Sequence, residues 1–423
     1  MEEHIEYKES PWGSIPSHWG ISSIKEETEV VTDYVANGSF ASLAENVKYK
    51  SKKDYAVLIR LVDYNNQFKG EFVYIDKNAY EFLSKSKLYG GEIIISNVGA
   101  NVGTVFKCPH LEYKMSLAPN SIMVKFKGNN DFYYYWLKSH YGQHMLQSIV
   151  TGSAQPKFNK TNFRDLNIPV PPYKEQERIA SILKSLDDKI ENNRRINENL
   201  EQQALALFKS WFVDFEPFKN GEFVESELGM IPKGWRVGDI YEYIKVIYGA
   251  PYKSSLFNEN KKGLPLIRIR DLKTNSPQFY TPEILPMTEY IEAGDVVAGM
   301  DAEFIPYVWQ GEKGVLNQRC CKFKGCNDAI SNYYILFLVK PQLEYVQSYK
   351  SGTTVSHLGK SDIDRFKFVT PPLDIIENFS KIVEPMKEEV VNRAKESRRL
   401  AELRDTLLPK LMSGEIKVED IKI

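Results

Sequence analysis

Residues 169–183 read PVPPYKEQERIASIL, and residues 369–383 repeat the pattern as VTPPLDIIENFSKIV. Each Pro-Pro pair is followed by apolar residues spaced three and four apart, which predicts a helix that starts directly after the prolines. The spacing continues in both copies for about 40 residues, or roughly 60 Å of helix at 1.5 Å per residue. Because an apolar stripe of that length must be buried, we expect the two helices to pack against each other or against other chains.

The remainder of the chain is duplicated as well. Lys160 has its partner at Lys360, and this offset of 200 residues holds through both helical regions. Upstream the offset grows to 208 at Arg60 and 216 at Trp19. Since loops tolerate insertions and packed helices do not, the pattern indicates a fixed scaffold that carries two diverging heads. The upstream repeat consists of IPxxW (15–19 and 231–235), LIRxxD (58–63 and 266–271), GEII with GDVV (91–94 and 294–297), and IMVKF with RCCKF (122–126 and 319–323).

Within each half, short runs rich in Val, Ile, Tyr and Phe are bounded by Gly, Asn and Lys, which is typical of strands. Residues 56–62 and 92–96 are two such runs, and residues 132–146 form an aromatic helical segment. The sequence therefore predicts an α+β protein with two β-rich, mixed α/β heads joined by two long helices. The predicted segments are a first head (1–172), a central helical region (173–215), a linker (216–227), a second head (228–370), a second helical region (371–412) and a tail (413–423).

Composition sets limits on compartment and partners. The chain has 423 residues, 42% of them hydrophobic and 26% charged, which suits two or three domains. It has no long apolar run, and its first residues (MEEHIEYKES) are acidic, so we expect a cytoplasmic chain without a membrane segment. Net charge is −1, yet residues 11–172 carry 18 Lys and Arg against 14 Asp and Glu, and residues 228–370 carry 18 against 15. Two mildly basic heads joined by acidic connectors are compatible with nucleic-acid binding.

Four cysteines in a chain of this length argue against a disulfide framework and for a reducing compartment. Cys320, Cys321 and Cys326 could form a zinc site. The repeat alignment, however, places Cys320 and Cys321 opposite Met123 and Val124 in an apolar strand, which favours buried thiols.

Polar residues interrupt the first helical stripe at Asn192-Asn193-Arg194-Arg195. One interpretation is a polar residue that faces the seam between helices and fixes their register at some cost in stability. The other is a solvated face on a long helix, and the sequence does not decide between them. Further on, residues 215–221 (FEPFKNG) should end the helix through proline and glycine.

Patterns of catalytic residues are weak. Val170-Pro171-Pro172-Tyr173 resembles the tetrad with which adenine methyltransferases hold the amino group of a flipped base, but valine cannot accept a hydrogen bond and the second copy reads TPPL. A stiff junction between strand and helix explains both copies better. Residues 99–103 have the wrong spacing for a phosphate-binding glycine loop, and His140 with His144 fits a core or surface role better than a metal site.

The chain resembles a known family, the specificity (S) subunits of type I restriction–modification systems. The resemblance covers the whole chain. It rests on IPSHWG (15–20) and IPKGWR (231–236), on PVPPYKEQERIASIL (169–183), on ALFKSWFVDFEPF (206–218) and on LRDTLLPKLMSGEI (403–416). One departure is Val355, which stands where the first copy has Gln155, so a shared polar role at that position is in doubt.

What the resemblance implies is a non-catalytic DNA-binding subunit. The heads would be target recognition domains, each reading one half of a bipartite site in double-stranded DNA. The helices would run antiparallel on a pseudo-twofold scaffold, set the spacer between half-sites, and dock two methyltransferase (M) subunits with restriction (R) subunits through them. No cofactor is expected on this chain, because S-adenosylmethionine, ATP and magnesium would belong to the partner subunits of the prokaryotic complex.

Candidate DNA contacts are polar and basic side chains in loops, since such groups read base edges and bind phosphates. Lys48 to Lys53 could equally form a solvated turn, and Arg60 and Arg268, present in both copies, could pair with Asp63 and Asp271 instead of reading DNA. The candidates in the first head are Lys48, Lys50, Lys52, Lys53, Arg60, Asn97, Asn101, Ser153, Gln155, Lys157, Asn159 and Lys160. Those in the second head are Tyr252, Lys253, Arg268, Arg270, Asp301, Glu303, Thr353, Thr354, His357 and Lys360.

Two other classes of function remain as alternatives. A self-sufficient DNA methyltransferase or nuclease would need a cofactor loop or an acidic metal cluster, and the sequence offers no candidate for either. A coiled-coil organiser without DNA affinity would need no groove-facing polar loops, and its complex would lack the steep salt dependence of duplex binding.

Overall fold

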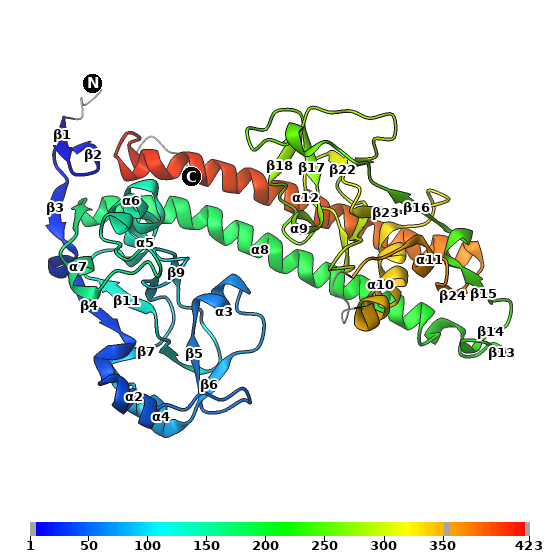
Figure 1. Cartoon of the computed structure of the whole chain (residues 1–423), viewed down its shortest axis with the longest axis horizontal. Helices are drawn as coiled ribbons and strands as arrows, with labels where there is room; N and C mark the ends of the chain where they lie inside the picture. Colours follow the sequence, from blue (N-terminus) through cyan, green and yellow to red (C-terminus); the bar gives the residue numbers. More distant parts are fainter. Residues whose placement is uncertain (1–5, 351–355, 419–423) are drawn as a thin grey trace. The chain divides into compact units, whose positions relative to one another are not determined.

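The computed structural model describes residues 6–350 and 356–418, and the chain divides into two compact units (Figure 1). One unit comprises Met1–Asp188 with Ala401–Ile423, and the other comprises Lys189–Leu400. Each unit holds one head together with a stretch of both long helices. Among the described residues, no helix combines the length and apolar character needed to span a membrane.

The long helices are α8 (Tyr173–Phe212) and α12 (Leu373–Met412). Both begin one residue after a Pro-Pro pair, as the sequence predicts. The first ends at Phe212, three residues before the predicted end, and Phe215 adopts a left-handed backbone conformation (φ 54°) before the turn Glu216–Phe218. A left-handed residue cannot continue an α-helix, which explains why the chain leaves its axis here.

Apolar stripes of the two helices are buried in each unit. In the first unit Ile179 and Leu183 of α8 share a core with Leu411 and Met412 of α12 and with the head. In the second unit Phe208 of α8 lies in the same core as Phe379 and Val383 of α12. Burial of these side chains, at about 25 cal/mol per Å² of apolar surface, is the main stabilisation of the pair.

The seam also contains the polar residues that the sequence left ambiguous. Asn193 has no exposed surface. Its Nδ2 donates to Glu396 Oε2 (2.7 Å) and Ser397 Oγ (3.3 Å), and its Oδ1 accepts from Arg393 Nη1 (3.1 Å). Four residues on, Asn197 Nδ2 donates to the carbonyl oxygen of Val390 (3.1 Å), so α8 and α12 run antiparallel here. The seam interpretation is therefore correct for Asn193, whereas Asn192 beside it is exposed.

Arg393 is the repeat counterpart of Asn193, at the common offset of 200 residues. In an antiparallel pair of equivalent helices, a residue can meet its own counterpart only where the local twofold axis crosses the seam. The Asn193–Arg393 contact marks that point on the helix pair.

The first head is built from two four-stranded sheets. One has the order β4 (Thr28–Asp33), β11 (Ser121–Phe126), β8 (Ile93–Ser96) and β9 (Val105–Lys107). The other has the order β6 (Val73–Ile75), β5 (Ala56–Ile59), β10 (Lys114–Leu117) and β7 (Lys87–Leu88). Strand β12 (Asn167–Val170), which leads into α8, pairs with β3 (Gly20–Ser23), and the terminal hairpin is β1 (Tyr7–Ser10) with β2 (Gly13–Pro16).

The second head repeats this plan. One sheet has the order β16 (Ile244–Tyr248), β23 (Cys320–Gly325), β20 (Val296–Gly299) and β21 (Pro306–Val308). The other has the order β18 (Phe279–Thr281), β17 (Leu264–Ile267), β22 (Gly314–Leu316) and β19 (Tyr290–Ile291). Strand β24 (Lys367–Thr370) pairs with β15 (Arg236–Asp239), and β13 (Phe223–Ser226) with β14 (Gly229–Pro232). In both heads one sheet has a single parallel pair, β5 with β10 and β17 with β22. The predicted α+β fold with two repeated heads and long helices is confirmed.

Two predicted elements are shorter than expected. The strand predicted at 56–62 ends at Ile59, because Arg60 caps helix α3 (Leu61–Asn65). The helix predicted at 132–146 consists of α5 (Asn130–Lys138) and α6 (His140–Ser148), separated by Ser139. Ser139 is extended and its hydroxyl accepts from the backbone N–H of Gly142, which starts a new helix. The matching region of the second head is one helix, α10 (Asn332–Lys350).

Strand pairing corrects the sequence alignment of the two heads. Ile94 of β8 lies opposite Met123, and its counterpart Val297 of β20 lies opposite Lys322. Lys322, and not Cys320, therefore takes the place of Met123. Side chains alternate with a period of two along a strand, so an alignment that slips by two residues keeps the buried face buried and escapes notice.

Cys320 and Cys321 are buried in β23, where burial raises the pKa of the Cys321 thiol to about 12. The buried-thiol interpretation is confirmed for these two, whereas Cys326, the third residue of the possible zinc site, is exposed. Residues 6–350 and 356–418 contain no cluster of three or more His, Cys, Asp or Glu side chains placed to hold a metal ion.

Each head is anchored to the helices by polar contacts within its own unit. In the first, Tyr135 Oη donates to Asp187 Oδ2 (2.7 Å), and Arg404 Nη1 donates to the other oxygen of the same carboxylate (2.6 Å). In the second, Gln310 Nε2 donates to Glu201 Oε1 (3.3 Å). Burial, followed by repulsion from Glu198, raises the pKa of Glu201.

Replacing Asn193 by alanine should lower the free energy of unfolding by about 1–3 kcal/mol, because it removes a fully buried side chain that hydrogen-bonds to Arg393, Glu396 and Ser397 of the other helix. Denaturant unfolding of the purified chain measures the change. Asn192→Ala, at the exposed neighbour, is the matched control and should stay within about 0.5 kcal/mol of the parent. Equal losses in the two variants would contradict a seam role for Asn193.

Glu201→Gln should stabilise the chain increasingly as pH rises. A carboxyl whose folded pKa lies above its unfolded value contributes stability that is complete at low pH and is lost as pH rises through the folded pKa. The neutral amide escapes this loss and can still accept from Gln310. Melting temperatures of parent and variant at about pH 4.5 and about pH 8 check the sign. Glu177→Gln, which removes one carboxylate at an exposed position of α8, is the matched control for the change in net charge.

Candidate nucleic-acid interface

In the first head, two loops that the sequence singled out lie side by side. The loop between β8 and β9 starts at Asn97, and the second loop includes Lys157. The backbone N–H of Gly99 donates to Pro156 O (2.8 Å), and that of Phe158 donates to Asn97 O (3.1 Å). The Asn97 side chain adds a bond from Nδ2 to Phe158 O (3.0 Å). These bonds join the candidates Asn97 and Lys157 into one surface.

The second head joins the corresponding loops in the same way. The backbone N–H of Leu358 donates to Met300 O (2.7 Å), and that of Ala302 donates to Ser356 O (3.0 Å). An isolated antiparallel bridge pairs Asp301 with His357, as Val98 pairs with Lys157 in the first head. The candidates Asp301, Glu303 and His357 are thus brought together.

A third loop, which sequence reasoning missed, completes the surface in both heads. It runs from residue 118 to 120 before β11, and from 317 to 319 before β23. The backbone N–H of Asn97 donates to Asn120 O (3.1 Å), and that of Met300 donates to Arg319 O (2.8 Å). Asn120 and Arg319 are therefore equivalent, and both are exposed. Correct alignment of β11 with β23 would have revealed them as a variable polar position between two strands.

A glutamine from the neighbouring helix holds the hairpin loop in each head. In the first head Gln147 Nε2 donates to Val102 O (3.2 Å). In the second, Gln347 Nε2 donates to Ala302 O (2.7 Å), and its Oε1 accepts from the backbone N–H of Phe304 (2.7 Å). The two glutamines are 200 residues apart. Because the three loops are held largely through backbone groups, their exposed side chains can vary without loss of the loop conformation.

The structure separates the first-head candidates into exposed and internally bonded groups. Lys50 is paired with Asp54 (2.6 Å), Lys160 with Asp33 (3.1 Å), and the Asn159 side chain caps helix α7 (Lys160–Arg164). The other exposed candidates are Lys48, Lys52, Lys53, Asn101, Ser153, Gln155 and Lys157. Lys48 to Lys53 lie beside β5 and β6, and Lys50 forms a bridge with Tyr74 of β6.

Arg60 and Arg268 occupy the same place in the two heads. Arg60 donates from Nε and Nη2 to the two carboxylate oxygens of the buried Asp63 (3.0 and 2.6 Å). Arg268 lies over the ring of Phe279, with Nε 3.8 Å from Asp271 Oδ2. The structural interpretation of these arginines is supported by this geometry, since each is directed into its own head.

Among the second-head candidates, Tyr252 is buried and its hydroxyl donates to Thr288 Oγ1 (3.0 Å), so its side chain is not exposed for contact with DNA. Arg270 Nη1 lies 3.5 Å from Gln278 Oε1, and Glu303 accepts from Tyr307 Oη (3.0 Å). Lys253, Arg270, His357 and Lys360 are exposed. Thr353 and Thr354, like Val355, lie outside the described residues.

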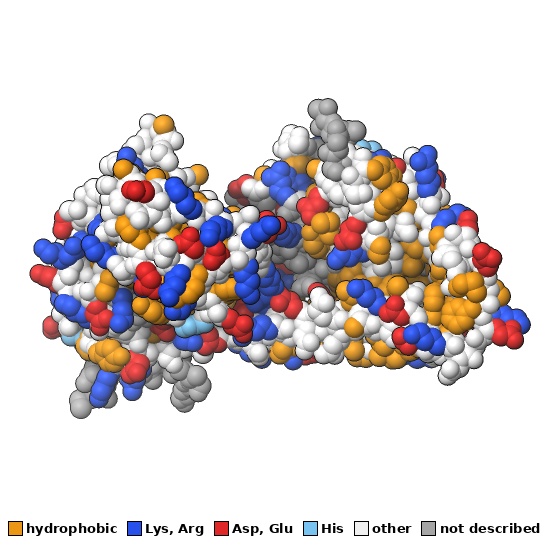
Figure 2. Space-filling view, turned by 90° about the horizontal axis from the view of Figure 1, so that it is seen from below, with side chains coloured by type: hydrophobic (Ala, Val, Ile, Leu, Met, Phe, Trp, Pro, Cys, Tyr) orange, Lys and Arg blue, Asp and Glu red, His pale blue; other side chains and the backbone are white. Residues whose placement is uncertain are grey.

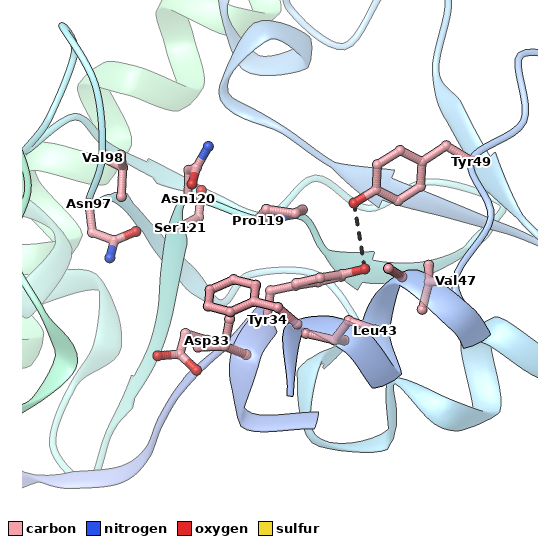
Figure 3. A pocket seen from close by; sticks show the side chains of 13 residues that line it. Asp33, Tyr34, Leu43, Val47, Tyr49, Asn97, Val98, Pro119, Asn120 and Ser121 are labelled. Atoms are coloured by element: carbon pink, nitrogen blue, oxygen red, sulfur yellow. Dashed lines mark hydrogen bonds between the residues drawn. The ribbon is translucent and has the colours of Figure 1, made fainter. Parts of the chain in front are cut away.

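Beside the three loops of the first head is a cavity of about 640 Å³ (Figure 3). Tyr34 and Tyr49 lie at one end, and Asn97 with Val98 lies at the other. A neighbouring cavity of about 400 Å³ shares Tyr49, Val98 and Asn120 and extends to Arg60. Burial, followed by its hydrogen bond with Tyr49 (3.5 Å), raises the pKa of the Tyr34 hydroxyl. Aromatic and amide groups around one hollow can both pack against a nucleobase and hydrogen-bond to its edge.

Charge alone does not mark this interface. Figure 2 shows Lys and Arg side chains interspersed with Asp and Glu over the face that it displays. The candidate interface is distinguished by its clustered amide, guanidinium and imidazole groups, which are the groups that read base edges.

The Pro-Pro sites have a structural role. Val170 ends β12 and Thr370 ends β24, each paired with a strand at the start of its head. In the first copy Gln176 Nε2 donates to Pro171 O (2.8 Å), which fixes the junction with α8. The interpretation as strand-to-helix junctions is confirmed.

Comparison with known proteins shows the family of this chain. Residues 16–202 and 213–397 each match the family model described as type I restriction modification DNA specificity domain. The MjaIX specificity subunit of a type I restriction enzyme from Methanocaldococcus jannaschii is 30% identical over 98% of both chains. The putative MjaX specificity subunit from the same organism is 24% identical, over 98% of this chain and 97% of its own. A solved structure of a type I restriction–modification S subunit from M. genitalium has the same fold, with a TM-score of 0.51, 15% identity and coverage of 93% of this chain and 96% of that one.

Replacing Arg60 by alanine should lower the free energy of unfolding by about 1–3 kcal/mol, because the buried Asp63 carboxylate loses two charge-assisted bonds. The recognised DNA sequence should stay unchanged. Lys52→Ala, at an exposed lysine of the same head, should leave stability within about 0.5 kcal/mol of the parent. A relaxed DNA sequence with unchanged stability in Arg60→Ala would contradict the structural role.

Proposed function

Because this chain belongs to the type I restriction modification DNA specificity family, we propose that each of its two heads reads one half of a bipartite site in double-stranded DNA. The chain is a specificity subunit, the non-catalytic DNA-recognition component of its system. The half-site read by each head would then be set by the side chains of its three-loop surface.

One observation carries this proposal: the two surfaces share a backbone and differ in side chains. Asn97, Val98, Asn120 and Lys157 in the first head correspond to Met300, Asp301, Arg319 and His357 in the second. Residues that merely hold the loops are kept in both heads, such as Gln147 and Gln347. A conserved frame with divergent exposed polar groups is what two readers of different sequences require.

The partners follow from the same scaffold. We propose that equivalent surfaces of the helix pair dock two methyltransferase subunits, with restriction subunits bound through them, and that the helix length sets the spacer between half-sites. S-adenosylmethionine, ATP and magnesium would act on those subunits in the prokaryotic cytoplasm. The two helical regions, which repeat at a constant offset of 200 residues, support two equivalent docking sites, since each copy offers the same pattern of side chains.

Exchange of residues 11–172 for the head of a relative tests the proposal. With M subunits present, mapping of methylated adenines should show one half-site replaced and the other half-site and spacer retained. Exchange of residues 228–370 is the reciprocal control and should change the other half only. A recognised sequence left wholly unchanged by both exchanges would refute the modular assignment.

A further inference from the structure

We propose that Arg319 reads a guanine in the half-site of the second head, with Asp301 as the residue that positions it. The inference rests on the proposed function, and it assigns a base and a residue that the family membership does not supply.

Arg319 is the last residue of the loop before β23, and 57% of its side chain is exposed. Its Nη1 lies 2.9 Å from Asp301 Oδ2, and the Asp301 side chain is only 20% exposed. The other oxygen of that carboxylate lies 2.6 Å from His357 Nδ1. Asp301 is thus held between two partners and cannot swing away with the arginine.

The backbone beneath Arg319 is equally constrained. Its carbonyl accepts from the N–H of Met300 (2.8 Å), and its own N–H donates to Asn317 Oδ1 (3.1 Å). An arginine fixed at its backbone and at one nitrogen has already lost much of its rotamer freedom. Less entropy remains to be lost when the side chain binds, so its contacts add more to affinity and to selectivity.

The free edge of the guanidinium points to guanine. Nε and Nη2 of Arg319 make no hydrogen bond with the described part of the chain, and these groups are parallel donors in a rigid plane. Guanine presents two acceptors, O6 and N7, in the major groove, and the bidentate contact with arginine matches them. Adenine, cytosine and thymine do not present that pair.

Asp301 also argues against a simple phosphate contact. The carboxylate offsets the charge of the arginine, so the pair attracts the DNA backbone less than an unpaired cation would. The hydrogen-bonding edge is unaffected. A neutralised, oriented arginine therefore favours base reading over phosphate binding.

The first head has Asn120 at the equivalent position. An amide favours adenine, because it can accept from N6 and donate to N7. The arginines shared by the heads, Arg60 and Arg268, are turned into the protein instead. Position 120/319 is thus an exposed place on the shared frame where the heads carry side chains with different base preferences.

The test uses the S chain assembled with its M subunits. The parent complex first gives the recognised sequence by mapping methylated adenines, and we expect a guanine, on either strand, in the second half-site. Duplexes are then made with 7-deazaguanine at each such guanine in turn, which removes the N7 acceptor alone. At one of these positions, 7-deazaguanine should weaken binding of the duplex to the parent complex. At that same position, 7-deazaguanine should not weaken binding to the Arg319→Ala complex, because the contact with N7 is already absent.

Arg319→Ala should relax the sequence at that single position, with a loss of discrimination of roughly 5- to 150-fold. The first half-site and the spacer should be retained. Asp301→Asn keeps the size of the side chain and removes its charge, so it should relax the same position while non-specific binding becomes stronger. Arg236→Ala is the matched control, because Arg236 is an exposed arginine of the same head paired with Glu242, and it should leave the motif intact.

Three outcomes would overturn the inference. They are a second half-site without guanine, an unchanged motif in Arg319→Ala, and a loss of affinity that is uniform across sequences, which would indicate a phosphate contact. A parent complex that methylates no bipartite motif would instead refute the proposed function itself. An Arg319→Ala chain that failed to assemble would still leave the Asp301→Asn variant and the 7-deazaguanine series on the parent to decide.

Discussion

The burial of two apolar helical stripes is the constraint on which the rest of this chain depends. Neither α8 nor α12 can expose its stripe to water, and in each unit both helices contribute to the core that also holds the head. Apolar burial is not directional, so it would allow the helices to slide past one another. The polar cluster of Asn193 with Arg393, Glu396 and Ser397 removes that freedom, because a shifted register would leave the buried Asn193 amide without hydrogen-bond partners.

In the heads, the groups that hold the loops are likewise largely separate from the exposed side chains. The three loops of each head are joined by backbone hydrogen bonds and held by one glutamine, and the side chains at positions 120 and 319 take no part in those bonds. Substitution of an exposed side chain on such a frame costs little stability. This explains how one chain can carry an amide at position 120 and a guanidinium at position 319 on the same backbone, and why recognition can diverge between the heads while the fold is kept.

Prediction of DNA contacts from the local sequence was wrong where a partner distant in sequence determines the role of a residue. Arg60 and Tyr252 are residue types that commonly contact DNA. In the structure, however, Arg60 is bonded to Asp63, and the buried Tyr252 donates to Thr288. Arg319 was missed for the opposite reason. A two-residue slip in the alignment hid it inside a strand, and only the pairing of β20 with β23 shows that it ends a loop.

The sequence by itself determined the periodic features of this protein: the duplication, the two helices after Pro-Pro, and the strand-rich heads. Hydrophobic periodicity is local, and it is written directly in the spacing of side chains. Only the tertiary structure decided that Asn193 faces the seam, that Cys326 is exposed, and that three loops distant in sequence form one surface in each head. Those outcomes depend on which segments meet across long stretches of chain, and composition and spacing carry no record of such partners.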